Sequence, residues 1–169
     1  MKQLMSERLT LIPIDTSDRA LVVALNTDAQ VMTFVAEPQS VEAANRIFDI
    51  ILRQTQAQPP KMYCWKITTA AQATAVGVIS LTRMKGEYQG WLEIGALSLP
   101  AFYGKGYIPE AMELVCADAL ERDEIKGIYA KFQAEHQASL RITRKTHFSK
   151  PQPSADFPGY LECTRRKTR

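Results

Sequence analysis

The sequence has no long apolar run, and this absence sets the first limit on what the chain can be. Its 169 residues contain no stretch close to the roughly 20 apolar residues that a membrane-spanning helix needs. Residues 1–14 (MKQLMSERLTLIPI) also lack an apolar run of signal-peptide length and a small-residue cleavage site. We therefore expect a cytoplasmic protein without a membrane partner.

Cysteine is scarce, with three residues at widely spaced positions, Cys64, Cys116 and Cys163. An odd number without any CxxC spacing argues against a disulfide framework and against a zinc site. Cys64 falls in a strand-like stretch and Cys116 on the apolar stripe of a helix. Both are therefore predicted to be small core residues.

A strong excess of one charge is also missing, since 21 basic residues face 18 acidic ones and leave a net charge of +3. So mild a balance does not favour nucleic acid as a partner. The positive charges gather late in the chain, at Arg141, Arg144, Lys145 and Lys150 and in the tail at residues 165–169. This basic end is either a solvated surface or a contact for an acidic ligand or a ribosomal surface.

The hydrophobic pattern predicts one mixed α/β domain over residues 1–169. Alternation of period two marks strands, and apolar stripes at helical spacing behind Asp, Ser or Gly mark helices. The predicted strands span residues 9–14, 62–68, 75–84, 91–99, 125–134 and 160–164, and the predicted helices span residues 15–26, 28–36, 41–56, 108–122 and 138–146. This order gives an α+β arrangement with a central, mostly antiparallel, twisted sheet of six or seven strands flanked by about four helices.

Residues 101–110 (AFYGKGYIPE) carry the strongest functional signal. They lie between the predicted strand at residues 91–99 and the helix that starts near residue 108. Gly104 and Gly106, with Lys105 between them, allow a tight turn whose N–H groups point inward. The first helical turn adds unpaired donors that carry about half a positive charge. This arrangement suits a diphosphate, and the alternative is a plain turn with a solvated lysine.

Five segments together resemble the GNAT acetyl-coenzyme A N-acetyltransferases, in particular their RimJ/RimL-like branch, which acetylates the N-termini of ribosomal proteins. They are YGKGYIPEA at residues 103–111, HQASLRITRKTHF at 136–148, SERLTLIPI at 6–14, NTDAQVMTFV at 26–35 and LEIGALSLP at 92–100. The resemblance covers most of the chain. It implies a GNAT-like fold, acetyl-coenzyme A as the cofactor, and direct acetyl transfer to a primary amine in a ternary complex.

The resemblance also implies which residues bind the coenzyme. Main-chain N–H groups from Phe102 to Tyr107 would hold its diphosphate. The pantetheine arm would lie along the strand at residues 95–99, where an N–H near Leu97 would meet the acetyl oxygen. The full predicted set is Leu97, Leu99, Phe102, Tyr103, Gly104, Lys105, Gly106, Tyr107, His136 and Ser139.

Three positions depart from the family pattern. Ala101 stands where many members have Arg or Gln, His136 stands where Asn is usual, and His147 stands where Gly precedes the final Phe. A cradle of main-chain donors does not need a side chain at position 101. The departures leave open a domain that binds coenzyme A without turnover, or an interaction domain whose turn binds nothing.

Acetyl transfer to an amine needs a base for the ammonium and an acid for the leaving thiolate. Glu93 is the candidate base, because it is a lone carboxylate in an otherwise apolar strand. Glu87 and His136 are rivals, and Glu93 could instead face solvent or pair with a lysine. The resemblance aligns Ser139 with the serine proposed as general acid in the Rim-type branch, while Thr143 replaces the Tyr of other members. Ser139 could equally be a helix-start residue or a coenzyme contact.

The resemblance alone suggests the acceptor. A protein N-terminal α-amine is favoured, and a small amine such as a polyamine, an amino acid or an aminoglycoside comes next. Acidic residues near the first helices, Asp28, Glu37 and Glu42, could meet a cationic acceptor or be ordinary surface charges. The expected assembly is a monomer or a homodimer.

Overall fold

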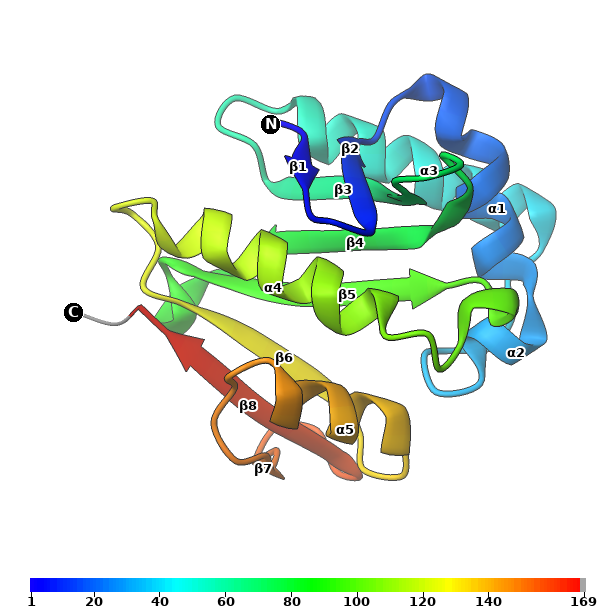
Figure 1. The fold of residues 1–169 in the computed structure, drawn as a ribbon. Coiled ribbons are helices and arrows are strands. Elements are labelled where there is room, and N and C mark those ends of the chain that lie inside the picture. Colours follow the sequence, from blue (N-terminus) through cyan, green and yellow to red (C-terminus); the bar gives the residue numbers. More distant parts are fainter. Residues whose placement is uncertain (168–169) are drawn as a thin grey trace.

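The computed structural model describes residues 1–167 and shows one open sheet with helices on both faces (Figure 1). Within these residues the sheet has eight strands in the order β1-β2-β3-β4-β5-β6-β8-β7. The strands are β1 (Leu4–Met5), β2 (Leu9–Pro13), β3 (Met62–Thr69), β4 (Ala75–Arg83), β5 (Trp91–Ser98), β6 (Gly127–Gln133), β7 (Gln152–Pro153) and β8 (Tyr160–Arg166). The α-helices are α1 (Arg19–Thr27), α2 (Ala29–Met32), α3 (Val41–Gln56), α4 (Tyr107–Leu120) and α5 (Gln137–Lys145).

The predicted mixed α/β fold with a mostly antiparallel sheet is confirmed. The sheet exceeds six or seven strands because β1 and β7 have only two residues each, too few for a period-two pattern. Among residues 1–167, no helix has the length and hydropathy of a membrane span. The last two residues of the basic tail, Thr168 and Arg169, lie outside the described residues.

Strands β5 and β6 form the one parallel pair among the described strands, and they pair only where β5 begins. Their register runs from Trp91↔Gly127 to Glu93↔Tyr129 and then stops. On its other side β5 pairs with β4 up to its last residue. The two strands therefore splay apart (Figure 1), and within the described chain residues 94–98 have no strand partner on the β6 side.

The core lies on both faces of the sheet. Figure 1 shows α4 and α5 in front of the sheet and α3 behind it. On the α4 face, Val115 and Ala119 pack against the buried side chains of the central strands. On the opposite face, Val22 of α1 and Phe48 of α3 pack against β3 and β4. The apolar stripes predicted for α3 and α4 face the sheet as expected, except that Val41 at the start of α3 is exposed.

The cysteines belong to this core. Cys64, Cys116 and Cys163 are free thiols and buried. Burial raises the pKa of Cys64 and of Cys116 to about 12. Both thiols therefore stay protonated at neutral pH, and the prediction that they are small core residues is confirmed.

Side-chain caps begin helices α2 and α3. The Asp28 carboxylate accepts hydrogen bonds from two N–H groups of α2, at 2.8 and 3.0 Å. The Ser40 hydroxyl accepts one from the N–H of Ala43 at 3.1 Å, which starts α3 at the predicted residue. Helix α2 ends at Met32, earlier than the predicted residue 36. Residues of both helices, among them Val31 and Ile51, line the cleft that is described below.

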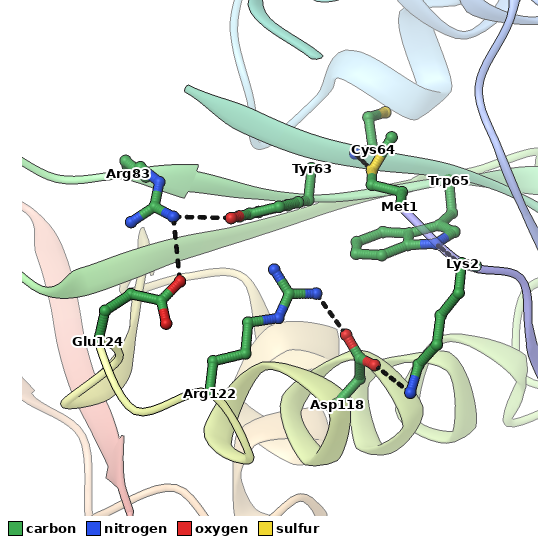
Figure 2. A network of polar contacts seen from close by, with 9 residues as sticks. All are labelled: Met1, Lys2, Tyr63, Cys64, Trp65, Arg83, Asp118, Arg122 and Glu124. Carbon is green, nitrogen blue, oxygen red and sulfur yellow. Dashed lines mark hydrogen bonds and ion pairs between the residues drawn. The ribbon is translucent and has the colours of Figure 1, made fainter. Parts of the chain in front are cut away.

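The N-terminal segment lies beside the C-terminal half of α4 and is held there by polar contacts (Figure 2). Lys2 Nζ lies 2.8 Å from Asp118 Oδ1, and the Lys2 carbonyl accepts a hydrogen bond from Trp65 Nε1 at 3.0 Å. Arg122 donates to the other Asp118 oxygen at 2.5 Å, and its guanidinium carbon lies 4.3 Å from the centre of the Tyr63 ring. Asp118 and Arg122 at this end of α4 are thus paired with each other, and Asp118 with Lys2 as well.

Candidate functional site

The glycine turn joins β5 to α4 through the short 3-10 helix η3 (Pro100–Phe102). Gly104 and Gly106 have φ values of 75° and 76°, in the left-handed region that favours glycine. Helix α4 begins directly after Gly106, at Tyr107. The predicted succession of strand, glycine turn and helix is confirmed.

Three of the six predicted amide donors in this turn already bond within it. The N–H groups of Phe102, Tyr103 and Lys105 donate to the carbonyls of Leu99 (3.0 Å), Pro100 (3.1 Å) and Phe102 (3.4 Å). Because η3 takes up these amides, the available donors lie further along than predicted. From Phe102 to Ile108, the N–H groups that have no acceptor among residues 1–167 are those of Gly104, Gly106, Tyr107 and Ile108.

A cleft of about 1270 Å³ opens between the separated strands β5 and β6 and the start of α4. Nine of the predicted site residues line it: Glu93, Leu97, Phe102, Tyr103, Gly104, Gly106, Tyr107, His136 and Ser139. Leu99 and Lys105 do not. Leu99 packs against the apolar cluster beneath α1 and α3, and the Lys105 ammonium lies 5.0 Å from the centre of the Phe102 ring. The sequence predicts that Lys105 helps to bind the coenzyme, but its side chain does not line the cleft.

Glu93 lies at the point where the two strands part. It is the last residue of β5 that pairs with β6, where it faces Tyr129, and it is half-buried at the cleft. Within residues 1–167 no basic side chain lies within ion-pair distance of its carboxylate. The rival Glu87 is exposed on the 3-10 helix η2 (Gly86–Tyr88) and does not line the cleft.

Ser139 and His136 form a pair at the start of α5. Ser139 Oγ lies 2.8 Å from His136 Nδ1, and the imidazole stacks on Phe34 with ring centres 4.6 Å apart. All three residues line the cleft. Burial, and then the positive charge of Arg141, lowers the pKa of His136 below its usual 6.5. The imidazole is therefore neutral at pH 7. The spacing of three residues between His136 and Ser139 at the start of a helix could have indicated their contact in the sequence.

The basic residues of α5 divide between the cleft and solvent. Arg141 and Lys145 line the cleft, whereas Arg144 is exposed and does not. His147 is exposed just beyond the helix end and has a φ of 58°. A left-handed residue at this position explains why the family pattern has glycine there.

Aromatic and acidic side chains lie close to Glu93 on neighbouring elements. The Tyr129 hydroxyl donates to Glu162 Oε2 at 2.9 Å, and the Tyr88 ring centre lies 5.5 Å from that of Tyr129. Burial, and then the neighbouring Glu162, raises the pKa of both tyrosines. Sequence reasoning missed this group because its members come from η2, β6 and β8, and no local pattern links them.

One of the three comparisons with known proteins shows the family. A family model described as an acetyltransferase (GNAT) domain matches residues 8–149. A search of curated proteins finds no match. Solved structures match over nearly the whole chain, but at sequence identities that show the fold alone.

Three of these structures illustrate the range. An acetyltransferase of the GNAT family from Bacillus anthracis has 18% identity and a TM-score of 0.79, over 98% of this chain and 99% of that one. RimL, the ribosomal L7/L12 alpha-N-protein acetyltransferase, in complex with coenzyme A, has 19% identity and a TM-score of 0.79, over 98% of each chain. Spermidine N-acetyltransferase from Vibrio cholerae, in complex with coenzyme A and spermine, has 13% identity and a TM-score of 0.80, over 96% and 97%.

Proposed function

This chain belongs to the GNAT acetyltransferase family and is an acetyl-coenzyme A-dependent N-acetyltransferase, and we propose that it acetylates a protein N-terminal α-amine by direct transfer. The observation that carries the coenzyme-dependent part of the proposal is a set of four N–H donors at the start of α4 that have no acceptor among residues 1–167. All four belong to residues that line the cleft: Gly104, Gly106, Tyr107 and Ile108.

These donors suit the diphosphate of the coenzyme. N–H groups at a helix start carry a partial positive charge of about one half, and they bind anions in many proteins. When bound, the coenzyme supplies the thioester from which the acetyl group is transferred. The unpaired side of residues 94–98 would receive the pantetheine arm as an added strand. Arg141 and Lys145, which line the same cleft, would meet a phosphate.

Three residues would then act on protons and charge. Glu93 takes a proton from the acceptor ammonium, which makes the nitrogen lone pair available for attack on the acetyl carbon. The register with β4 turns the Leu97 N–H toward Val78. The donor to the acetyl oxygen would therefore be a neighbouring N–H on the open side of β5, that of Ala96 or Ser98. Such donors contribute about 10²–10³ in rate where negative charge develops.

As the carbon–sulfur bond breaks, Ser139 gives its hydroxyl proton to the sulfur. The nitrogen loses its second proton to solvent as the amide forms, and Ser139 takes a proton back from solvent. The contact with His136 holds Ser139 Oγ in place.

The acceptor is inferred from similarity and from the surface beside Glu93. The likeness to RimL, which acts on the α-amine of a ribosomal protein, spans almost the full length of both chains and supports a protein N-terminus. A small cationic amine is the second candidate, because Tyr88, Tyr129 and Glu162 would attract a positive charge next to Glu93.

Two measurements test the proposal in order. Calorimetry with acetyl-coenzyme A should show binding, and thiol release should then rise with a peptide that has a free N-terminus and not with the same peptide blocked at its N-terminus. A faster rate with spermine than with any peptide would favour the small-amine candidate. Binding without thiol release on the whole amine panel would leave a coenzyme-binding domain, and no binding at millimolar coenzyme would refute both enzyme proposals.

A further inference from the structure

The segment before β2 reaches the glycine turn through the side chain of Arg8. Its Nη1 donates to the carbonyl oxygen of Lys105 at 3.1 Å, and Nη2 donates to that of Gly106 at 3.4 Å. Nε donates to Glu110 Oε2 at 2.7 Å, and Nη2 forms an ion pair with the same oxygen. The guanidinium carbon lies 5.1 Å from the centre of the Tyr107 ring. One side chain thus contacts both the turn and the first turn of α4.

The two carbonyls that Arg8 holds share peptide units with two of the free donors. In a trans peptide unit the C=O of one residue and the N–H of the next point in opposite directions. A grip on the carbonyls of Lys105 and Gly106 therefore turns the N–H groups of Gly106 and Tyr107 the other way. Gly106 and Tyr107 line the cleft, whereas Arg8 does not.

The turn needs such an external grip. Gly104 and Gly106 have no side chains to fix their backbone, and glycine accepts many other conformations. A hydrogen-bonded guanidinium fork is rigid and planar, so it can define the orientation of two neighbouring carbonyls at once. The contact also links residues about 100 positions apart in the chain.

We infer that Arg8 is a positioning residue for the coenzyme diphosphate, and that it acts by orienting the peptide units on either side of Gly106. The inference rests on the proposed function. Its action is orientation rather than attraction of the phosphates, because Glu110 neutralises the guanidinium. Ser6 Oγ donates to the other Glu110 oxygen at 2.6 Å and fixes the carboxylate in turn. Burial opposes ionisation of Glu110, but the hydrogen bonds from Ser6 and Arg8 prevail and lower its pKa.

The test compares coenzyme A binding, by calorimetry, in the wild type, Arg8→Gln, Arg8→Lys and Lys2→Gln. Lys2→Gln is the matched control, because Lys2 lies on the same N-terminal segment and pairs with the same helix at its far end. We expect Arg8→Gln to weaken binding about tenfold, the scale of lost charge-assisted hydrogen bonds. Arg8→Lys keeps the charge but loses the fork, so it should lose most of this affinity too. Lys2→Gln should bind like the wild type.

Two further measurements separate orientation from general damage and from charge. S-acetylpantetheine carries the thioester but no diphosphate, so Arg8→Gln should use this donor as fast as the wild type does, while its KM for acetyl-coenzyme A rises. The Arg8→Gln/Glu110→Gln double variant removes the carboxylate that Arg8→Gln leaves unpaired. If orientation is the cause, the double variant stays as weak as Arg8→Gln.

The outcomes are distinguishable. Wild-type affinity in Arg8→Gln, equal losses with both acetyl donors, or recovered affinity in the double variant would each overturn the role of Arg8 and leave the proposed function intact. A wild-type protein that binds no coenzyme would overturn the proposed function and this inference together.

Discussion

The two ends of α4 treat their polar groups in opposite ways. At the C-terminal half, the buried carboxylate of Asp118 is bonded by both Lys2 and Arg122 (Figure 2). At the N-terminal end, the N–H groups of Gly106 and Tyr107 have no acceptor among residues 1–167, and the preceding backbone is left-handed. One end of the helix is built for stability and the other for binding.

This difference shows how a single helix can serve two purposes. Removing one partner of a paired, buried charge lowers stability, because the other charge is left buried without compensation, and such a pair offers nothing to a ligand. Unpaired donors at a cleft contribute nothing to stability until a ligand accepts their hydrogen bonds. Substitutions at the two ends should therefore affect different measurements.

The largest effect is expected from Gly106→Asp at the binding end. Any side chain at a φ of 76° is strained, and a carboxylate here would repel the diphosphate from the donors around it. Coenzyme A affinity should fall by at least about 100-fold, which corresponds to about 2.7 kcal/mol. Calorimetry measures this directly.

Gly86→Asp is the control for that variant. Gly86 is also left-handed, at a φ of 64°, but it lies on η2, away from the cleft, and a side chain there would meet open space. It introduces the same kind of strain without touching the turn. Equal loss of coenzyme affinity in both variants would mean that the glycine turn is not the binding site.

Glu93→Gln should have the next largest effect and tests the point where the strands part. The amide cannot take up a proton, so acetyl transfer should slow by about 100-fold, within the range for general-base catalysis. Coenzyme A affinity should stay the same, because Glu93 lies away from the turn. Thiol release at saturating coenzyme measures the rate. An unchanged rate would move the base role to His136.

Asp118→Asn should lower stability and leave coenzyme affinity unchanged. It removes the carboxylate that pairs with the half-buried Arg122. The loss should be about 2 kcal/mol in the free energy of unfolding, measured with denaturant. A change in coenzyme affinity of similar size would contradict the separation between the two ends of α4.

The same variant should change how stability depends on pH. Burial tends to raise the pKa of Asp118, but its bonds to Lys2 and Arg122 lower it below the usual 3.8. A lowered pKa in the folded state means that the stabilisation is complete above pH 3.8 and is lost as the pH falls through the folded value. Asp118→Asn should therefore weaken the loss of unfolding free energy as the pH falls from 3.8 to the folded-state pKa. If the variant loses stability in this pH range as steeply as the wild type does, Asp118 does not cause the loss.

Lys2→Gln should have the smallest effect. The Lys2 side chain is 66% exposed, and exposed ion pairs contribute little. The midpoint of thermal unfolding should shift less than in Asp118→Asn. A larger shift would show that Lys2, and not Arg122, is the main partner of Asp118.

The sequence predicts local features of this molecule well. The Ser40 cap and the apolar stripe of α3 predict that helix to the residue at its start. The order of strand, glycine turn and α4 is equally visible, because each part has its own residue pattern. Such features depend on neighbours within about four residues, so the sequence states them directly.

Features that join distant segments could not be predicted. Arg8 and Glu110 are 102 positions apart, and nothing local marks either as the partner of the other. The parting of β5 and β6 after Glu93 depends on how the two strands pair, and no local residue pattern specifies where that pairing stops. The hydrogen bonds within η3 and directly after it depend on the exact backbone conformation from Pro100 onward. Three of the predicted N–H donors are used in these bonds, so the free donors lie further along the chain than predicted.

The unpaired stretch of β5 has one further consequence, for solubility. An open strand at the rim of a sheet can recruit a strand from another molecule and seed aggregates. Residues 94–98 are instead open in the interior of the sheet, between β4 and the diverging β6. The opening between the two strands has room for an extended molecule but not for a folded one. The N–H and C=O groups of this stretch can therefore stay unpaired without binding a strand from a second copy of the chain.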